Sequence, residues 1–81
     1  MDGVLAKDGP MEIIAKYFGK KEVKREDRLD QDCGADSGDR IDLSLELSEQ
    51  LDVHIPDAVV EKICDAQTVG EVIDYVNQLP T

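Results

Sequence analysis

Apolar residues recur at helical spacing along the chain, and no alternation typical of a strand runs long enough to matter. The first predicted helix begins near Pro10, places Met11, Ile14 and Phe18 on one face, and ends at Gly19. A proline is tolerated in the first turn because its missing N–H would be unpaired there anyway. The pattern therefore starts with a short amphipathic helix.

Three further helices are predicted downstream. The second covers about residues 37–51 and the third, a short one, about residues 56–64. The fourth begins at Thr68, where Thr68 and Glu71 have the spacing of a capping box, and it is bounded by Pro80. Its apolar stripe consists of Val69, Val72, Ile73 and Val76.

A long charged segment, residues 20–36, connects the first two helices, with Val23 and Leu29 as its main apolar anchors. A connection of this length within a compact domain is usually functional. Residues 1–9 are expected to be loosely packed. We therefore expect a single domain over residues 1–81, an all-α small helical bundle with one long loop.

The second helix carries two apolar stripes on nearly opposite sides. One consists of Leu43, Leu47 and Leu51, and the other of Ile41 and Leu45. Carboxylates accompany the second stripe: Asp39, Asp42, Glu49 and Asp52. Because burial of an unpaired carboxylate is costly, the leucine stripe is the better candidate for the core, and Ile41 and Leu45 are expected to form a protein-binding face. The alternative is that both stripes are buried, against different helices.

The charge balance limits the partners. The chain has 19 acidic and 9 basic residues, a net charge of −10 and a pI near 4.3. Nucleic acids and anionic membranes would repel such a surface, whereas basic patches on other proteins would attract it. The alternative is that the charge serves solubility alone. At 81 residues the chain is also too small for a deep catalytic cleft, which favours a binding module or a substrate over an enzyme.

The cysteines and the histidine do not form a recognisable site. Cys33, Cys64 and His54 lack the spacing of zinc ligands, so no metal is expected. Residues at the start of the chain show no signal peptide or membrane span. We therefore expect a cytoplasmic protein with reduced thiols, and a disulfide between Cys33 and Cys64 is the less favoured alternative. We also expect a monomer.

Ser37 opens the second helix directly after Asp36, and the small residues Gly34 and Ala35 leave its approach uncrowded. Either Asp36 or Ser37 fits the N-cap of the helix, which is the purely structural reading. The functional reading is that a phosphodiester on Ser37 would be stabilised by the unpaired N–H groups at the helix N-terminus. His54 lies at the far end of the helix, so a catalytic dyad with Ser37 is not expected.

Four motifs in order resemble the acyl carrier proteins of bacteria. The run Asp-Cys-Gly-Ala-Asp-Ser at residues 32–37 is similar to their signature, and the stretch from Asp39 to Leu51 keeps their helix-two pattern. Ile55-Pro56-Asp57 with Glu61-Lys62-Ile63 resembles their entry into helix three, and Ile73-Asp74-Tyr75-Val76 their last helix. The resemblance covers about residues 29–79.

This resemblance implies an antiparallel four-helix bundle and a 4′-phosphopantetheine arm on Ser37, which a holo-carrier synthase (a phosphopantetheinyl transferase) adds from coenzyme A. Acyl groups of fatty-acid, lipid or polyketide-type biosynthesis would then ride on the arm as thioesters, and the protein itself would not be an enzyme. Acyltransferases, synthases or ligases would dock through basic patches. The implied partner-binding residues are Asp36, Gly38, Asp39, Ile41, Asp42, Leu45, Glu49, Asp57 and Glu61.

The sequence departs from the family pattern at several positions. Gly38 replaces a leucine that partners commonly contact, and Cys33 also stands where leucine is usual. Ser44 and Glu46 are polar at positions near the cavity that shelters acyl chains, and about three extra residues lengthen the connection at residues 64–68. These departures favour a specialised carrier with a short or polar cargo. An aminoacyl or D-alanyl carrier and an unmodified interaction module are the alternatives.

Overall fold

Four helices occur among residues 9–79, the part of the chain that this computed structural model describes. They are α1 (Pro10–Tyr17), α2 (Ser37–Leu51), α3 (Asp57–Asp65) and α4 (Val69–Asn77). No strand is present within this range, only an isolated bridge between Arg28 and Thr68. The all-α prediction is confirmed. The expected loose packing of residues 1–9 falls, except for Gly9, outside the described residues, as does Pro80.

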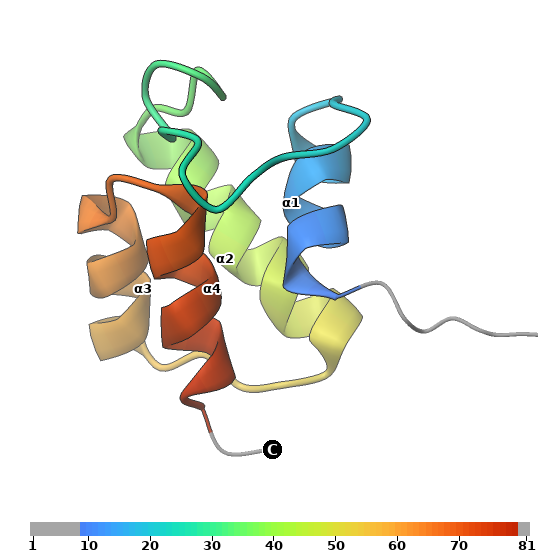
Figure 1. Ribbon diagram of the computed structural model, residues 1–81. Helices are drawn as coiled ribbons and strands as arrows, with labels where there is room; N and C mark the ends of the chain where they lie inside the picture. Colours follow the sequence, from blue (N-terminus) through green and yellow to red (C-terminus); the bar gives the residue numbers. More distant parts are fainter. Residues whose placement is uncertain (1–8, 80–81) are drawn as a thin grey trace, which may run out of the picture.

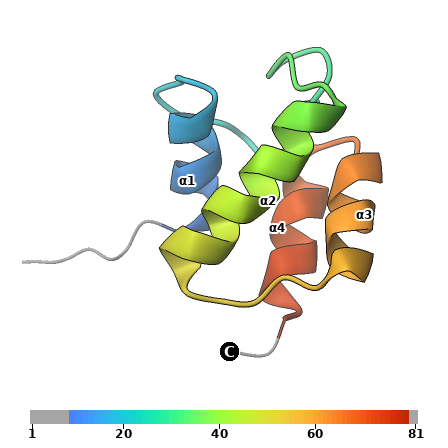
Figure 2. The ribbon, with the colours of Figure 1, turned by 180° about the vertical axis from the view of Figure 1, so that it is seen from behind.

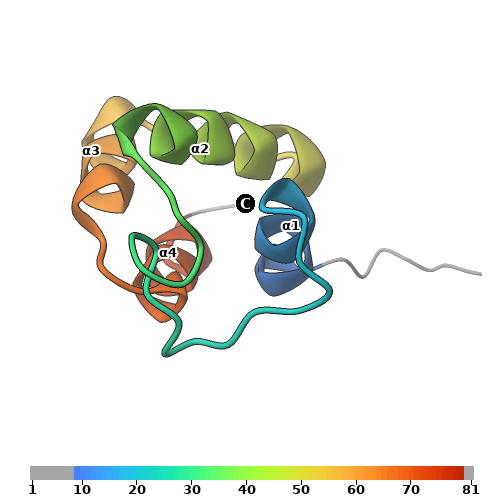
Figure 3. The ribbon, with the colours of Figure 1, turned by 90° about the horizontal axis from the view of Figure 1, so that it is seen from above.

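Successive helices run in opposite directions, as Figure 1 and the view from behind in Figure 2 show. Each helix contacts two others: α1 packs on α2 and α4, and α3 packs on α2 and α4. Seen from above, α2 lies across one side of the bundle and α4 on the other, with α1 and α3 between them (Figure 3). Helix α2 therefore has one face toward the core and another left uncovered by the other helices.

The helix ends follow local chemistry. Helix α1 ends in a Schellman motif: Gly19 has φ +69°, the Lys20 N–H donates to Ala15 O at 2.8 Å, and the Gly19 N–H donates to Lys16 O at 3.1 Å. At the start of α4, Thr68 Oγ1 accepts from the Glu71 N–H, as the capping-box spacing predicts. Helix α3 begins one residue later than predicted because Pro56 is its N-cap.

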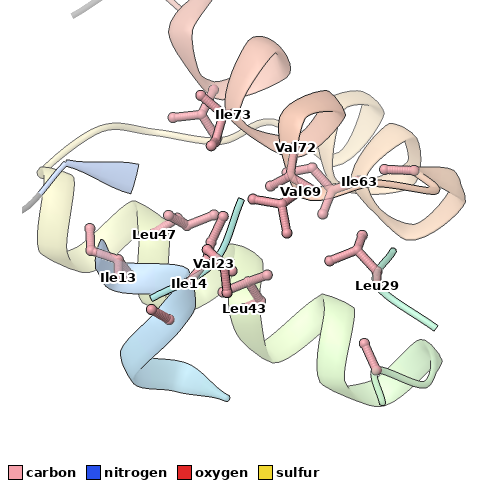
Figure 4. Close-up of a cluster of buried hydrophobic side chains, with 14 of the residues drawn as sticks. Ile13, Ile14, Val23, Leu29, Leu43, Leu47, Ile63, Val69, Val72 and Ile73 are labelled. Atoms are coloured by element: carbon pink, nitrogen blue, oxygen red, sulfur yellow. The ribbon is translucent and has the colours of Figure 1, made fainter. Parts of the chain in front are cut away.

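The core consists of side chains from all four helices and from the loop between α1 and α2 (Figure 4). Leu43 and Leu47 of α2 are fully buried in it. Val23 and Leu29 are also buried, which confirms them as the anchors of the long loop. An apolar loop residue with no exposed surface, such as Leu29, holds its segment in place because exposing it would cost about 1.5–3 kcal/mol.

The same loop is hydrogen-bonded to the start of α4. The Val69 N–H donates to Asp27 O at 3.0 Å and the Gly70 N–H donates to Arg25 O at 2.9 Å, so loop carbonyls satisfy N–H groups that a helix N-terminus leaves unpaired. Gly70 makes this approach possible, because a Cβ there would lie 3.1 Å from Arg25 O. The Arg25 guanidinium also pairs with both carboxylate oxygens of Asp74 at 3.0 Å. The segment leading to Ser37 is thus fixed at its base.

Candidate functional site

Ser37 is the first residue of α2 and is exposed. The N-cap is Asp36, whose carboxylate accepts from the Asp39 N–H at 2.8 Å, while the Asp39 carboxylate accepts from the Asp36 N–H at 3.2 Å. This reciprocal box decides between the two candidate caps that the sequence left open. Within the described part of the chain, the Ser37 hydroxyl has no hydrogen-bond partner.

The residues before Ser37 are anchored. Ala35 is buried, and its N–H donates to Leu29 O at 2.7 Å. Gly34 has φ +71°, a left-handed conformation that glycine adopts without strain. Ser37 therefore projects from a fixed turn, with small residues on its approach.

The two stripes of α2 have different environments. Leu43 and Leu47 have no exposed surface and Leu51 is partly buried, whereas Ile41 is 48% exposed and Leu45 is 59% exposed. The leucine stripe is thus the core stripe, and the alternative that both stripes are buried is excluded. Large apolar side chains with this exposure are typical of protein-binding surfaces when a polar rim surrounds them.

The predicted acidic residues lie on the surface of α2 and α3. Asp36, Asp42, Glu49, Asp57 and Glu61 are exposed, Asp39 is half-buried, and Gly38 is exposed beside Ser37.

Few positive charges offset this acidity. Between residues 37 and 65, the basic residues Arg40 and Lys62 stand against eight acidic ones: Asp39, Asp42, Glu46, Glu49, Asp52, Asp57, Glu61 and Asp65. Both basic residues are engaged, since Arg40 bonds to carbonyl oxygens and Lys62 Nζ lies 5.9 Å from the centre of the Tyr75 ring. The region is therefore strongly negative.

Two residues near the site were missed by sequence reasoning. Arg40, three positions after Ser37, extends from α2 to the end of α3, where its Nη1 donates to Cys64 O and, at 2.6 Å, to Ala66 O. Tyr17 at the end of α1 lies beside α2, and its pKa is raised by burial, by the charges of Asp42 and Asp39, and by hydrogen bonding to Asp42. The sequence signal that could have identified Arg40 is its position beside the leucine stripe of α2, where a charged residue needs a polar partner.

A pocket of about 330 Å³ lies between α2 and α3, farther along α2 than Ser37. We refer to it as the α2–α3 pocket. It is lined by Ile41, Ser44, Leu45, Ser48, His54, Ile55, Asp57 and Val60. Ser44 is almost fully buried, at 2% exposure, as expected of a residue near an inner cavity. Glu46 does not line this pocket, and its carboxylate accepts from Gln50 Nε2 at 2.7 Å.

Both cysteines are free thiols and half-buried. Burial raises the pKa of the Cys33 thiol, with Asp27 and Asp32 acting in the same direction against Lys20. Over residues 9–79, no three His, Cys, Asp or Glu side chains are grouped as metal ligands would be.

The chain is similar to known carrier proteins. The family model described as "Phosphopantetheine attachment site" matches residues 11–76. Acyl carrier proteins of Chlorobium phaeovibrioides and Chlorobium phaeobacteroides are 42% and 40% identical to it over 72 residues, with 86% of this chain and 88% of each relative covered. The family match includes the first helix, which the sequence motifs did not reach.

The chain belongs to the acyl carrier proteins, a family of carriers that bear acyl groups on covalently attached 4′-phosphopantetheine and are not enzymes. Fatty-acid biosynthesis is the typical role of the family. The described residues suit this cofactor, because an exposed, unpaired serine hydroxyl stands at a helix N-terminus that stabilises a phosphodiester. When bound, the arm supplies a terminal thiol for thioester formation. None of the helices in residues 9–79 is long and apolar enough to span a membrane.

Proposed function

We propose that Ser37 is the residue to which the 4′-phosphopantetheine arm is attached. The observation that carries this assignment is that the helix cap does not use Ser37. Asp36 and Asp39 cap α2, and among the described residues the exposed Ser37 hydroxyl has no hydrogen-bond partner. The other serines of α2 are committed elsewhere, since Ser44 Oγ donates to Arg40 O and Ser48 Oγ donates to Val53 O. Ser37 is thus the serine best placed to react.

The modification needs a partner enzyme. Ser37 Oγ would attack the diphosphate of coenzyme A, forming a phosphodiester to pantetheine and releasing adenosine 3′,5′-bisphosphate. A base must accept the hydroxyl proton, and no side chain among the described residues bonds to Ser37 to do so. We therefore assign this base to the holo-carrier synthase.

The synthase and later acyltransferases, synthases or ligases bind on one surface, which we call the docking face. It consists of Asp36, Gly38, Asp39, Ile41, Asp42, Leu45, Glu49, Asp57 and Glu61. Ile41 and Leu45 supply apolar contact, and the surrounding carboxylates attract basic patches, which raises the rate of encounter more than the affinity. We also place the protein in the cytoplasm as a monomer, and its two free thiols are consistent with a reducing compartment.

Modification can be measured directly. The apo-protein is incubated with coenzyme A and a broad-specificity phosphopantetheinyl transferase, and its intact mass is recorded. The wild type is expected to gain the mass of one 4′-phosphopantetheine, Ser37→Ala none, and the control Ser48→Ala the full gain. A wild type that gains nothing would favour the unmodified interaction module over the carrier.

The docking face is tested by introducing a positive charge on its apolar stripe. Leu45→Lys places a cation on the exposed stripe, and we expect slower modification with little change in the urea midpoint because Leu45 is not in the core. Gln78→Lys, on the exposed end of α4, adds the same charge elsewhere and serves as the matched control. Equal rates for the two variants would show that the synthase docks on another surface.

A further inference from the structure

Three serines of α2 lie on one side of the helix. Ser44 and Ser48 follow Ser37 by seven and eleven residues, and at about 100° per residue the three fall within roughly 40° of one another. Ser44 lies about 10 Å along the axis from Ser37, at a rise of about 1.5 Å per residue. The face that begins at Ser37 therefore leads to the α2–α3 pocket.

The α2–α3 pocket is small and partly polar. Its volume of about 330 Å³ is near the lower limit of the range common for ligand pockets, about 300–1,000 Å³. Ser44, Ser48, His54 and Asp57 contribute polar atoms to a lining that is otherwise aliphatic. A long alkyl chain would displace water from these polar side chains and could not replace the hydrogen bonds that the water makes, which is unfavourable.

Three of the four polar residues of the pocket offer acceptors, whereas the ring of the fourth, His54, can also donate. Ser44 Oγ donates its proton to Arg40 O at 3.0 Å, and Ser48 Oγ donates to Val53 O at 2.6 Å. Each hydroxyl thus offers only oxygen lone pairs to a bound group. Asp57 adds a carboxylate, which accepts hydrogen bonds and repels anions. The pocket therefore favours a group that donates a hydrogen bond over a carboxylate or a plain alkyl chain.

Arg40 limits widening of the pocket. Its guanidinium holds the Cys64 and Ala66 carbonyls, so the end of α3 and the segment with the extra residues are tied to α2. Hydrogen bonds from a charged donor are among the stronger ones in proteins. The C-terminal end of α3 is therefore not free to swing away from α2, while the pocket residues Asp57 and Val60 lie in the first half of that helix.

We propose that this carrier takes a short acyl group bearing a hydrogen-bond donor, a hydroxyl or an amino group, and that Ser44 and Ser48 determine this specificity. The inference rests on the proposed attachment of the arm to Ser37. It concerns only the cargo, so the two can be tested separately.

The test compares cargoes on the same protein. Coenzyme A thioesters of butyrate, 3-hydroxybutyrate, 3-aminobutyrate, succinate and octanoate are loaded by a broad-specificity phosphopantetheinyl transferase. Intact mass of the wild type and of Ser37→Ala reports whether the arm is loaded and whether loading needs Ser37, and a failure there is a failure of the proposed function. On fully loaded protein, amide NMR shifts at Ser44, Ser48 and Val60 and the thermal midpoint report where the cargo lies.

The hydroxy and amino cargoes are expected to shift these amides more than butyryl does, and to raise the midpoint by about 4 °C or more, as one new buried hydrogen bond would. Succinyl and octanoyl are expected to resemble the unacylated arm. In Ser44→Ala the advantage of the hydroxy cargo over butyryl should be lost. Two results would overturn the proposal. One is that octanoyl shifts these amides in the wild type as much as the hydroxy cargo does. The other is that the double variant Ser44→Ala/Ser48→Ala still favours the hydroxy cargo over butyryl.

Discussion

Replacing Arg40 with alanine tests how the end of α3 is held. The side chain is half-buried, and Nη1 alone donates to two carbonyl oxygens, Cys64 O and Ala66 O. A hydrogen bond to a charged group contributes about 1.5–3 kcal/mol. The positive charge also interacts favourably with the C-terminus of α3, by about 0.3–1 kcal/mol.

Water can replace part of this interaction after Arg40→Ala, since Arg40 and Cys64 are only half-buried, whereas Ala66 is buried. We therefore expect a loss of about 2–3 kcal/mol in the free energy of unfolding, less than the sum of the individual contributions. A domain of this size has a total of about 4–12 kcal/mol, so the variant should remain folded but be clearly weakened. The thermal midpoint should fall by about 8–24 °C.

Urea unfolding followed by circular dichroism measures the loss. Arg28→Ala is the matched control, because Arg28 makes an exposed ion pair with Asp30 at 3.4 Å that contributes less than about 1 kcal/mol. Arg40→Lys should recover part of the stability, since a lysine keeps the charge but not the planar guanidinium. If Arg40→Ala lowers the free energy of unfolding no more than Arg28→Ala does, the hydrogen bonds from Arg40 to the Cys64 and Ala66 carbonyls do not stabilise the fold.

Three further changes follow from the structure. Gly38→Ala should raise the free energy of unfolding by up to about 1 kcal/mol in urea titrations, because a Cβ there meets only Asp36 Oδ1 at 3.5 Å and glycine disfavours helix; an unchanged midpoint would contradict this. Gly70→Ala should lower the free energy of unfolding in urea titrations by about 1–3 kcal/mol, because its Cβ would press on the Arg25 backbone. A neutral effect would mean that the loop shifts without cost. The raised pKa of Tyr17 means that the native state holds the phenol proton more tightly than the unfolded state does. The free energy of unfolding should therefore fall as pH rises above about 10. In Tyr17→Phe, unfolding curves between about pH 9 and 11 should show a smaller fall.

Local signals account for the helices that the sequence predicted correctly. The Thr68 cap, the Gly19 stop and the apolar spacing of α2 depend on neighbours within a few residues, and all three have the predicted roles. The exposure of Ile41 and Leu45 was also predictable, because carboxylates on the same side of α2 oppose burial. The start of α3 was one residue off, since a proline fits either the N-cap or the first turn.

Interactions between distant residues were not predictable in the same way. The bonds from Arg40 to Cys64 and Ala66 span more than twenty positions. The docking of the α1–α2 loop on the start of α4 likewise depends on the whole bundle. At Ser37 the sequence left the N-cap ambiguous, because both Asp and Ser cap helices well, and the carboxylate of Asp39 decides for Asp36.

The most direct test of the central claim locates the arm on the chain. Trypsin cleavage after Arg28 and Arg40 yields the peptide of residues 29–40, in which Ser37 is the only serine. After modification with coenzyme A and a phosphopantetheinyl transferase, fragmentation mass spectrometry should place one 4′-phosphopantetheine on Ser37 of this peptide. An unmodified peptide in fully converted protein, with the added mass on Ser44 or Ser48 instead, would contradict the assignment.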